Sequence, residues 1–217
     1  MEARSLTSEE FREVISNFAS GVTVVTVLHE GRQYGTTASA VTSLSLDPPM
    51  LLICMNKQSE TGRAVSAAGH FAVNILGSGQ AGLAKRFAQK GDDKFTGVRV
   101  TPGKWGEPLF EDALATLECT ISEETSGGTH YVFLAEVEGG AASGGTPLAY
   151  FRGQFGRLEL TRDQLEYGAN TLDDELRAAD ADLAAAIDGG DLDGALAAIR
   201  ARCERMTAIA RARINGS

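Results

Sequence analysis

The stretch GTTASAVTSLSLDPP, residues 35–49, decides the fold of this chain. Hydroxyl side chains alternate there with small or apolar residues, a period of two that is typical of a β-strand. The small side chains would leave the backbone open, so that N–H groups and hydroxyls meet the acceptor atoms of a planar heteroaromatic ring. An ordinary Ser/Thr-rich edge strand explains the same composition equally well.

Further strands are predicted on both sides of this stretch, because β-branched residues cluster between turn-forming Gly, Asp and Pro. About six or seven strands with few and short helices predict a mainly β fold, a closed or half-closed antiparallel barrel. The predicted strands are residues 22–28, 31–46, 50–56, 70–76, 114–122, 131–138 and 148–160, with short helices at 8–19, 59–68 and 80–87 and a loop at 139–147.

The composition excludes several classes of protein. The chain has 217 residues, 43% hydrophobic and 23% charged, as in folded globular proteins. Its 20 Lys and Arg against 29 Asp and Glu give a formal net charge of -9. This negative field disfavours nucleic acid and anionic membranes as partners. Any phosphate that the chain binds must therefore be held by local cations.

The composition changes after residue 160, where Ala, Leu, Asp and Arg dominate and proline is absent. Apolar residues recur at intervals of three and four over residues 172–187 and 192–210, which predicts two helices. We therefore expect a barrel domain at 1–160 and a C-terminal α-helical hairpin at 161–217. The hairpin is interpreted as an appendage for packing or dimerisation.

Neither the cysteines nor the N-terminus indicates export. Cys54, Cys119 and Cys203 are far apart and fall within apolar stretches, so we expect buried free thiols in a reducing compartment. The N-terminal residues are acidic and amphipathic, and the longest apolar run, residues 50–55, is too short to span a bilayer. The prediction is a cytoplasmic protein.

Several segments within residues 11–157 resemble, in the same order, the flavin reductase domain of two-component flavin-dependent monooxygenases. No single segment is specific, whereas their order and spacing together are typical of that family. The resemblance implies a split β-barrel of the FMN-binding, flavin reductase-like type, and a homodimer. The segments are GVTVVT at 21–26, GTTASAVTSLSLDPP at 35–49, CMNKQSET at 54–61, HFAVNIL at 70–76, LAKRFA at 83–88, DKF at 93–95, GTH at 128–130 and PLAYFRGQFGRL at 147–158.

The resemblance also implies which residues bind the flavin. They form a wall along the isoalloxazine ring, a set near the ribityl or phosphate group, another side of the pocket, and a cationic cover. In that order they are Thr37, Ala38, Ser39 and Ala40 with Ser43 and Ser45 further along, then Asn56, Lys57 and Ser59, then Asn74, Ile75 and Leu76, and last Lys85, Arg86 and Phe87.

A second set is implied for the nicotinamide nucleotide. His130 matches the histidine of the family's GDH motif, which is associated with that nucleotide, and is the expected catalytic residue. Thr129 replaces the usual acid, so only a neutral hydrogen bond is offered to the imidazole. Tyr150, Phe151 and Arg152 match the aromatic and basic closing strand, where stacking on nicotinamide and a phosphate contact are expected.

The implied activity is that of an NAD(P)H:flavin oxidoreductase. It would transfer hydride from NADH or NADPH to FAD or FMN and supply reduced flavin to a separate oxygenase component. The sequence leaves both choices of nucleotide open, with a slight preference for FAD and NADH, and it shows no metal-ligand motif. Two alternatives remain: a flavin-binding sensor that uses the helical tail, and a split-barrel oxidase with permanently bound flavin.

Overall fold

The computed structural model of this chain describes residues 5–91, 93–159 and four later positions, Gly194, Leu196, Ala197 and Ile199. The chain divides into two units, Met1–Leu158 and Glu159–Ser217, and all the elements named here belong to the first. The predicted hairpin at 161–217 lies outside the described residues, apart from those four positions, which are helical. Over the described residues, no helix has the length and apolar character needed to cross a membrane.

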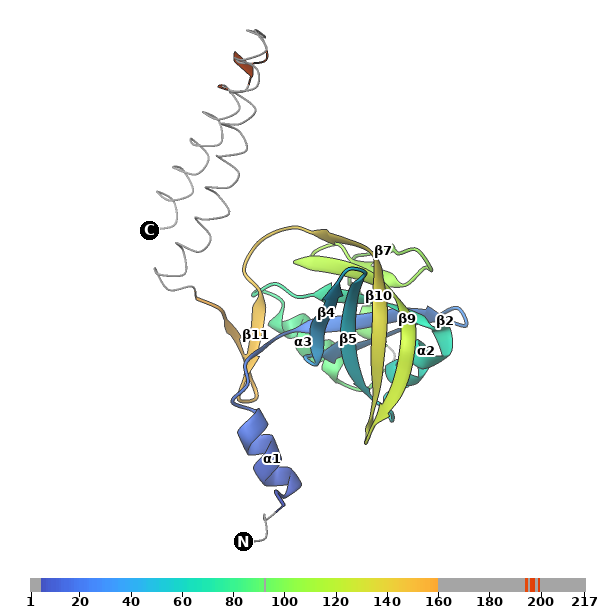
Figure 1. Ribbon diagram of the computed structural model, residues 1–217, viewed down its shortest axis with the longest axis vertical. Coiled ribbons are helices and arrows are strands. Elements are labelled where there is room, and N and C mark those ends of the chain that lie inside the picture. Colours follow the sequence, from blue (N-terminus) through green and yellow to red (C-terminus); the bar gives the residue numbers. More distant parts are fainter. Residues whose placement is uncertain (1–4, 92, 160–193, 195, 198, 200–217) are drawn as a thin grey trace. The chain divides into compact units, whose positions relative to one another are not determined.

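Seven antiparallel strands form the main sheet, which curls into a barrel (Figure 1). The order across it is β3-β2-β6-β9-β10-β5-β4. Every one of these strands overlaps a segment predicted from the sequence, and the mainly β fold is confirmed. Their bounds are β2 (Thr23–His29), β3 (Arg32–Ala38), β4 (Val41–Leu46), β5 (Pro49–Asn56), β6 (His70–Ile75), β9 (Ala115–Gly127) and β10 (His130–Ala142).

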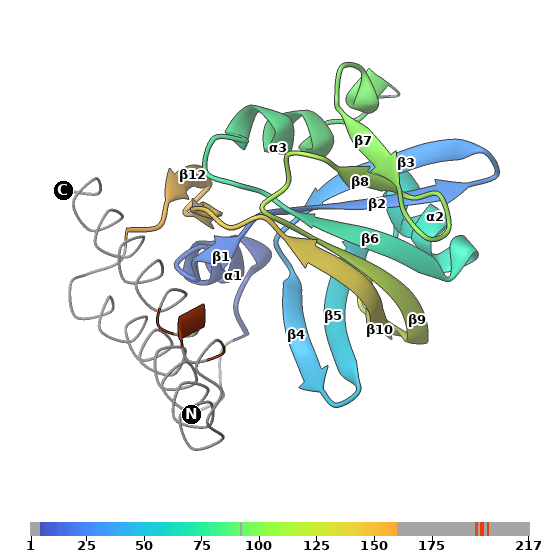
Figure 2. The same cartoon turned by 90° about the horizontal axis from the view of Figure 1, so that it is seen from above.

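The single strand predicted at 31–46 is wrong in one respect, because the chain breaks at Ser39 and Ala40 into β3 and β4. These two strands are the opposite edges of the main sheet. Since a link of two residues can span only about 11 Å between its flanking Cα atoms, the sheet must curl until its edges meet. Figure 2 shows β3 and β4 diverging from this link, and the barrel is split along that line.

We call residues 38–41 the corner. The hydroxyl of Thr23 donates to the carbonyl oxygen of Ala38 at 2.8 Å. The N–H of Cys54 donates to the carbonyl oxygen of Ala40 at 3.0 Å. Because these donors belong to β2 and β5, the corner is tied to both halves of the sheet.

The barrel interior is an apolar core that helix α2 (Glu60–Ala68) closes at one end. Val25 and Val27 of β2 point into it, as the period of two in a strand requires. Ala64 and Val65 of α2 are buried in the same core. The strands therefore present one apolar face inward, which is the pattern predicted from their alternation.

One cysteine lies in this core. Burial raises the pKa of the Cys119 thiol to about 12, so the group stays protonated and unreactive. Cys54 is half-buried, and both residues are free thiols. The predicted buried free thiol is confirmed at Cys119, while Cys203 lies outside the described residues.

A second core lies on the outer face of β2 and β6, under helix α3 (Ala81–Ala88). Phe87 of α3 is fully buried there, and its ring contacts Phe110 at a centroid distance of 5.2 Å. Gly35 lets the helix approach the strand, because a Cβ at that position would lie 2.6 Å from the Phe87 ring. β2 is consequently buried on both faces.

Two small sheets complete the fold, and two predictions about the C-terminal strands are wrong. The last strand, predicted over 148–160, is a hairpin that turns at Arg152 and Gly153, and the loop predicted at 139–147 is strand as far as Ala142. The small sheets consist of β1 (Ser20–Gly21), β11 (Leu148–Phe151) and β12 (Gln154–Arg157), and of β7 (Val100–Pro102) with β8 (Pro108–Phe110); a 3-10 turn, η1, covers Asp93–Phe95.

Helix α1 (Ser8–Ile15) begins at a capping box and buries none of its residues in this chain. Thr7 accepts from the N–H of Glu10, whose carboxylate accepts from the N–H of Thr7. The helix nevertheless carries an apolar face, and it extends away from the barrel (Figure 1). The face consists of Phe11, Val14 and Ile15, continued by Phe18, all of them exposed.

The turn between β7 and β8 buries a carboxylic acid. Glu107 has no exposed surface, one of its oxygens accepts from the N–H of Trp105 at 2.8 Å, and the other has no partner among the described residues. Desolvation raises the pKa of this carboxyl, and the negative charge of Glu118 raises it further. This carboxyl is therefore a weaker acid in the folded state than in the unfolded chain.

The Glu107→Gln variant is expected to gain stability relative to the wild type as the pH rises. A raised pKa contributes stability that is complete below the unfolded-state pKa, about 4.3 for Glu, and is lost as the pH rises through the folded-state pKa. The neutral amide does not undergo this loss. Urea denaturation from about pH 4 to pH 8 measures it, with exposed Glu123→Gln as the control. A difference between Glu107→Gln and wild type that stays constant over this range would contradict the prediction.

Candidate active site

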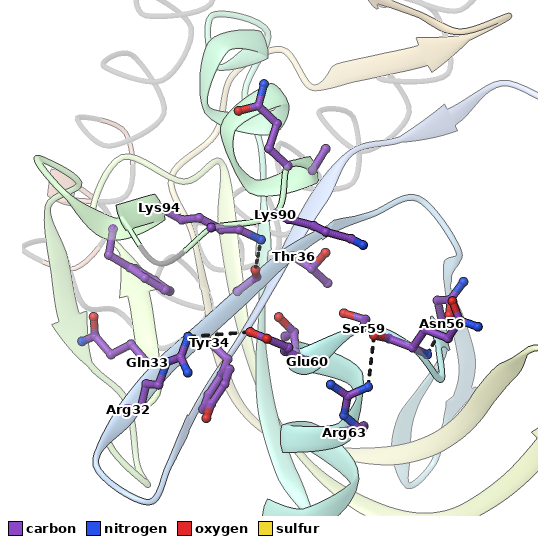
Figure 3. Close-up of a pocket in the computed structure, with 17 residues that line it drawn as sticks. Arg32, Gln33, Tyr34, Thr36, Asn56, Ser59, Glu60, Arg63, Lys90 and Lys94 are labelled. Carbon is purple, nitrogen blue, oxygen red and sulfur yellow. Dashed lines mark hydrogen bonds and ion pairs between the residues drawn. The ribbon is translucent and has the colours of Figure 1, made fainter.

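A cleft with a volume of about 650 Å³ runs along the edge strand β3 (Figure 3). Its other walls are the start of α2 with the turn before it, and the segment that follows α3. We call it the β3 cleft. It is lined by Arg32, Gln33, Tyr34, Gly35, Thr36, Asn56, Gln58, Ser59, Glu60, Thr61, Arg63, Ala88, Gln89, Lys90, Gly91, Lys94 and Phe95.

Lys94 fixes one wall of the cleft. Its ammonium group donates to the carbonyl oxygens of Gly35 at 3.1 Å and Phe87 at 3.2 Å. Desolvation lowers the pKa of this lysine, although the nearby charge of Glu60 opposes the shift. The bonds tie the segment after α3 to the outer edge of β3, so the two walls keep a fixed separation.

The start of α2 forms the opposite wall. The carboxamide oxygen of Asn56 accepts from the N–H of Gln58 at 2.8 Å, which closes the turn after β5. Ser59 is the N-cap of α2, and its hydroxyl accepts from the N–H of Gly62 at 3.4 Å. Asn56 and Ser59, both predicted to bind the flavin, thus line the β3 cleft.

The cleft carries positive charge in a chain that is negative overall. Among the described residues, Arg32, Arg63, Lys90 and Lys94 line it, against a single carboxylate, Glu60. The guanidinium of Arg32 pairs with this carboxylate at 3.6 Å. Such a local excess of cations is what an acidic chain needs in order to hold a phosphate group.

A second concavity, about 1110 Å³, lies between the corner and α1, and we call it the α1 groove. It brings Ser39 and Ala40, predicted for the flavin, to the same surface as Tyr150 and Arg152, predicted for the nicotinamide nucleotide. Arg152 is already engaged, because its Nε donates to the carboxamide oxygen of Asn17 at 2.9 Å. In this structure its guanidinium is bonded to the segment that follows α1.

His130 begins β10 directly opposite Asn56, the last residue of β5. The Thr129 hydroxyl lies 2.9 Å from Nδ1 of the imidazole, as expected for the neutral hydrogen bond that replaces a charged one. The register between β5 and β10 therefore brings the residue predicted for nicotinamide next to a residue predicted for flavin.

Lys57 has a different partner from the one expected. Its ammonium group donates to the carbonyl oxygen of Gly128 at 2.8 Å and to the hydroxyl of Ser126. Its own N–H donates to the carbonyl oxygen of Thr129 at 3.1 Å. The geometry thus makes Lys57 the residue that anchors the β9–β10 turn in front of His130, and its contact with a flavin phosphate stays a prediction.

Four other residues predicted to bind the flavin are engaged in packing. Asn74 has no exposed surface, and its amide donates to the carbonyl oxygen of Val24 while its oxygen accepts from the N–H of Phe110 at 2.7 Å. Leu76 and Phe87 are fully buried in the second core. The hydroxyl of Thr37 donates to a backbone carbonyl of α3. Their side chains stabilise the elements that form the site, and a direct contact with the flavin stays a prediction.

The remaining predicted residues are distributed over the same region. Lys85 and Arg86 are exposed on α3, where Arg86 donates to the carbonyl oxygen of Thr96 at 2.9 Å. Ala38 and Ile75 are half-buried against the barrel core. The others lie on β4, where Ser43 is exposed and Ser45 half-buried, and on β11, where Phe151 is exposed.

Sequence reasoning missed the outer half of the β3 cleft. Arg32 and Tyr34 share one side of β3 with Thr36, at a spacing of two residues. This spacing extends the alternation of the stretch at 35–49 toward the N-terminus and could have identified them. No pattern in the sequence identifies Lys90 and Lys94 as site residues, because only the folded chain brings their segment to β3.

Residues 15–159 match the family model described as the flavin reductase like domain. A curated relative, the reductase component of 4-nitrophenol 4-monooxygenase/4-nitrocatechol 2-monooxygenase from Rhodococcus opacus, is 50% identical over 160 residues, 74% of this chain and 86% of the relative. The reductase subunit HsaB of a flavin-dependent monooxygenase from Mycobacterium tuberculosis is 36% identical over 152 residues, 69% of this chain and 81% of the relative.

Solved structures agree with these matches. The NADH:FAD oxidoreductase SgcE6 from Streptomyces globisporus, in complex with NAD and FAD fragments, has a TM-score of 0.68 and 34% identity, and the alignment covers 74% of this chain and 99% of that one. BorF, the flavin reductase component of a bacterial two-component tryptophan halogenase, has a TM-score of 0.66 and 30% identity, covering 71% and 100%.

Replacing Asn74 by Ala is expected to lower the free energy of unfolding by about 1–3 kcal/mol, because it leaves the buried N–H of Phe110 without its acceptor. Urea denaturation measures the loss. Asn17→Ala, which removes an exposed carboxamide, is the control and should change stability by less than about 1 kcal/mol. An Asn74→Ala protein as stable as the wild type would show that this amide is not structural.

Proposed function

The chain belongs to the flavin reductase-like domain family, and we propose on this basis that it transfers hydride from NADH to a flavin and releases the reduced flavin to a separate oxygenase polypeptide. Relatives that match most of the chain are named as reductase components of such monooxygenases. The oxygenase would be the second polypeptide of the pair.

The observation that carries the proposal is the juxtaposition of Asn56 and His130. Asn56 lines the β3 cleft, and His130 is its register neighbour on β10. A flavin in the cleft and a nicotinamide beside His130 would therefore meet at one end of β5. Two ring systems that must exchange a hydride need this proximity.

The residues of the cleft fit a phosphorylated flavin. β3 is an edge strand, so alternate residues turn their N–H and C=O groups away from β2, and Gly35 is one of them because its carbonyl accepts from Lys94. Such an edge can meet the carbonyl and nitrogen atoms of an isoalloxazine ring. Arg63 and Lys90 lie within the same cleft and supply positive charge for the phosphate.

When bound, the nicotinamide and the flavin would themselves supply the hydride-transfer chemistry. The chain's task is to hold the rings in contact and to exclude water. Thr129 orients the His130 imidazole through Nδ1, which leaves Nε2 for a contact with the nicotinamide nucleotide. The proposed role of His130 is therefore positioning and polarisation, with no acid–base triad.

NADH is the proposed donor, supported by the relative that is named an NADH:FAD oxidoreductase. NADPH is the alternative donor, and a cytoplasmic location stays a prediction. A sensor or an oxidase would differ in the assay: a sensor binds flavin without turnover, and an oxidase purifies with stoichiometric flavin.

We also propose that the chain acts as a homodimer. The apolar face of α1 has no partner among the described residues, and Phe18 is 75% exposed. The edge strand β4 adds further exposed apolar surface, with Leu46 89% exposed. Exposed apolar side chains gathered on one helix face and one edge strand are typical of an interface.

Replacing Ser39 by Trp is expected to lower kcat/KM for flavin at least about tenfold, because the indole would fill the corner while the exposed position leaves the fold intact. Steady-state NADH oxidation with FAD, FMN and riboflavin measures the effect. Ser143→Trp is the matched control, since Ser143 lines neither the β3 cleft nor the α1 groove and is also exposed. Full activity of Ser39→Trp would refute the predicted role of the corner in flavin binding.

Replacing Phe11 by Glu is expected to convert the dimer to a monomer, because a carboxylate on the apolar face of α1 would have to be desolvated at the interface. Light scattering after size-exclusion chromatography gives the molar mass. Arg12→Glu, on the polar side of the same helix, should remain dimeric. A wild-type protein that is monomeric at micromolar concentration would disprove this interface.

A further inference from the structure

The hairpin of β9 and β10 carries His130 at its tip. β6 pairs with β9 only as far as Thr120, so over residues 123–127 β9 pairs with β10 alone among the described strands. The turn at the tip consists of two residues, Gly128 and Thr129. The position of His130 therefore depends on how β5 and the segment after it hold this turn.

Lys57, the residue after β5, is bonded to this turn at three acceptors. Its backbone N–H donates to the carbonyl oxygen of Thr129 at 3.1 Å. Its ammonium group donates to the carbonyl oxygen of Gly128 at 2.8 Å and to the hydroxyl of Ser126. Hydrogen bonds from a charged donor are stronger than neutral ones, so the side chain is a firm anchor for the turn.

The Lys57 ammonium and the His130 imidazole lie on opposite faces of the hairpin. Residues directly opposite each other in antiparallel strands share a face, so Asn56 and His130 point to the same side. Ser126 is opposite Tyr131, one residue after His130, so its side chain points to the other side. Because the ammonium is bonded to the Ser126 hydroxyl, it leaves the face of the imidazole open to a ligand.

The β3 cleft does not receive this lysine. Asn56 and Gln58, on either side of Lys57 in the chain, are among the described residues that line the cleft, whereas Lys57 is not. To reach a phosphate in the cleft, its ammonium group would have to give up its bonds to Gly128 and Ser126. The charge of Lys57 therefore serves the turn that carries His130.

We propose that Lys57 is a positioning residue for the nicotinamide side of the reaction. By holding the turn against the end of β5, it sets the place of the His130 imidazole and of the Thr129 hydroxyl, which lies 2.9 Å from Nδ1 of that ring. The inference rests on the proposed reductase function and deepens it. It is an alternative to the flavin phosphate contact that the family resemblance implies for Lys57.

Three variants change the anchor in graded steps. Lys57→Met removes the ammonium group and keeps an unbranched stem, whereas Lys57→Arg keeps a charged donor. Ser126→Ala removes one acceptor and leaves the lysine charged. The matched control is Lys104→Met, because the ammonium group of Lys104 pairs with Glu138 on the same strand β10, far from His130.

The first measurement is the NMR spectrum of the imidazole groups, which does not depend on turnover. The chain has three histidines, and His130→Ala identifies the signals of His130. Lys57→Met should shift these signals and leave those of His29 and His70 in place, while Lys57→Arg should restore them. Lys104→Met should leave the His130 signals where they are. Unchanged His130 signals in Lys57→Met would overturn the inference.

Steady-state kinetics measure the consequence for the reaction. With NADH varied and riboflavin as the acceptor, Lys57→Met should lower kcat/KM for NADH about five- to tenfold, a loss of the order of one charge-assisted contact, and Ser126→Ala should lower it less. Lys57→Arg and Lys104→Met should stay within about twofold of the wild type, as should the KM of Lys57→Met for FAD at saturating NADH.

A double-mutant cycle shows whether Lys57 acts through His130. In a His130→Ala background, Lys57→Met should lower kcat/KM for NADH by less than about twofold more, because two residues that act through one group are not additive. An undiminished effect in that background would refute the inference.

The remaining outcomes separate the inference from the function on which it rests. If Lys57→Met raises the KM for FAD and FMN but not for riboflavin, the lysine contacts the flavin phosphate and the inference is wrong. If the wild type oxidises NADH with no flavin, the proposed function fails, whereas a shift of the His130 signals in Lys57→Met would still show that Lys57 fixes the imidazole.

Discussion

The link of two residues at the corner is the constraint on which the rest of the molecule depends. Ser39 and Ala40 connect the opposite edges of a seven-stranded sheet, so the sheet has to close on itself. β3 stays an edge strand, because it pairs only with β2 among the described strands, and its outward backbone groups face a cleft instead of another strand. The same link borders the α1 groove, so one feature of the chain places both concavities.

Local cations allow a chain with a net negative charge to bind phosphorylated ligands. Two lysines of this region serve the walls rather than the ligand: Lys94 joins β3 to the segment after α3, and Lys57 anchors the β9–β10 turn. Each donates to at least one backbone carbonyl, which fixes loop positions. The side chains that line the cleft beside them can then bind a phosphate without first having to organise the loops.

The sequence predicted the β elements well, because alternation and β-branched residues report directly on which segments pair in a sheet. It could not place the break at Ser39 and Ala40, since both residues fit a continuous strand. It could not tell that Asn74 is engaged in packing, because β6 is buried on both faces and has no polar side that a pattern could identify. The partner of Thr37 is a backbone carbonyl of α3, which only the folded chain brings near. The position of Lys90 in the cleft depends on a long-range contact between α3 and β3. Local sequence patterns carry no information on such contacts.

The close approach of Gly35 and Phe87 has a consequence for how such a site can evolve. No residue larger than glycine fits at position 35 without moving the Phe87 ring. A substitution at this position would therefore disturb the whole wall of the cleft. Arg32, Gln33 and Lys90 are exposed and can change freely. Selectivity for one nucleotide or another can therefore diverge between descendants of this chain while the barrel that carries it stays the same.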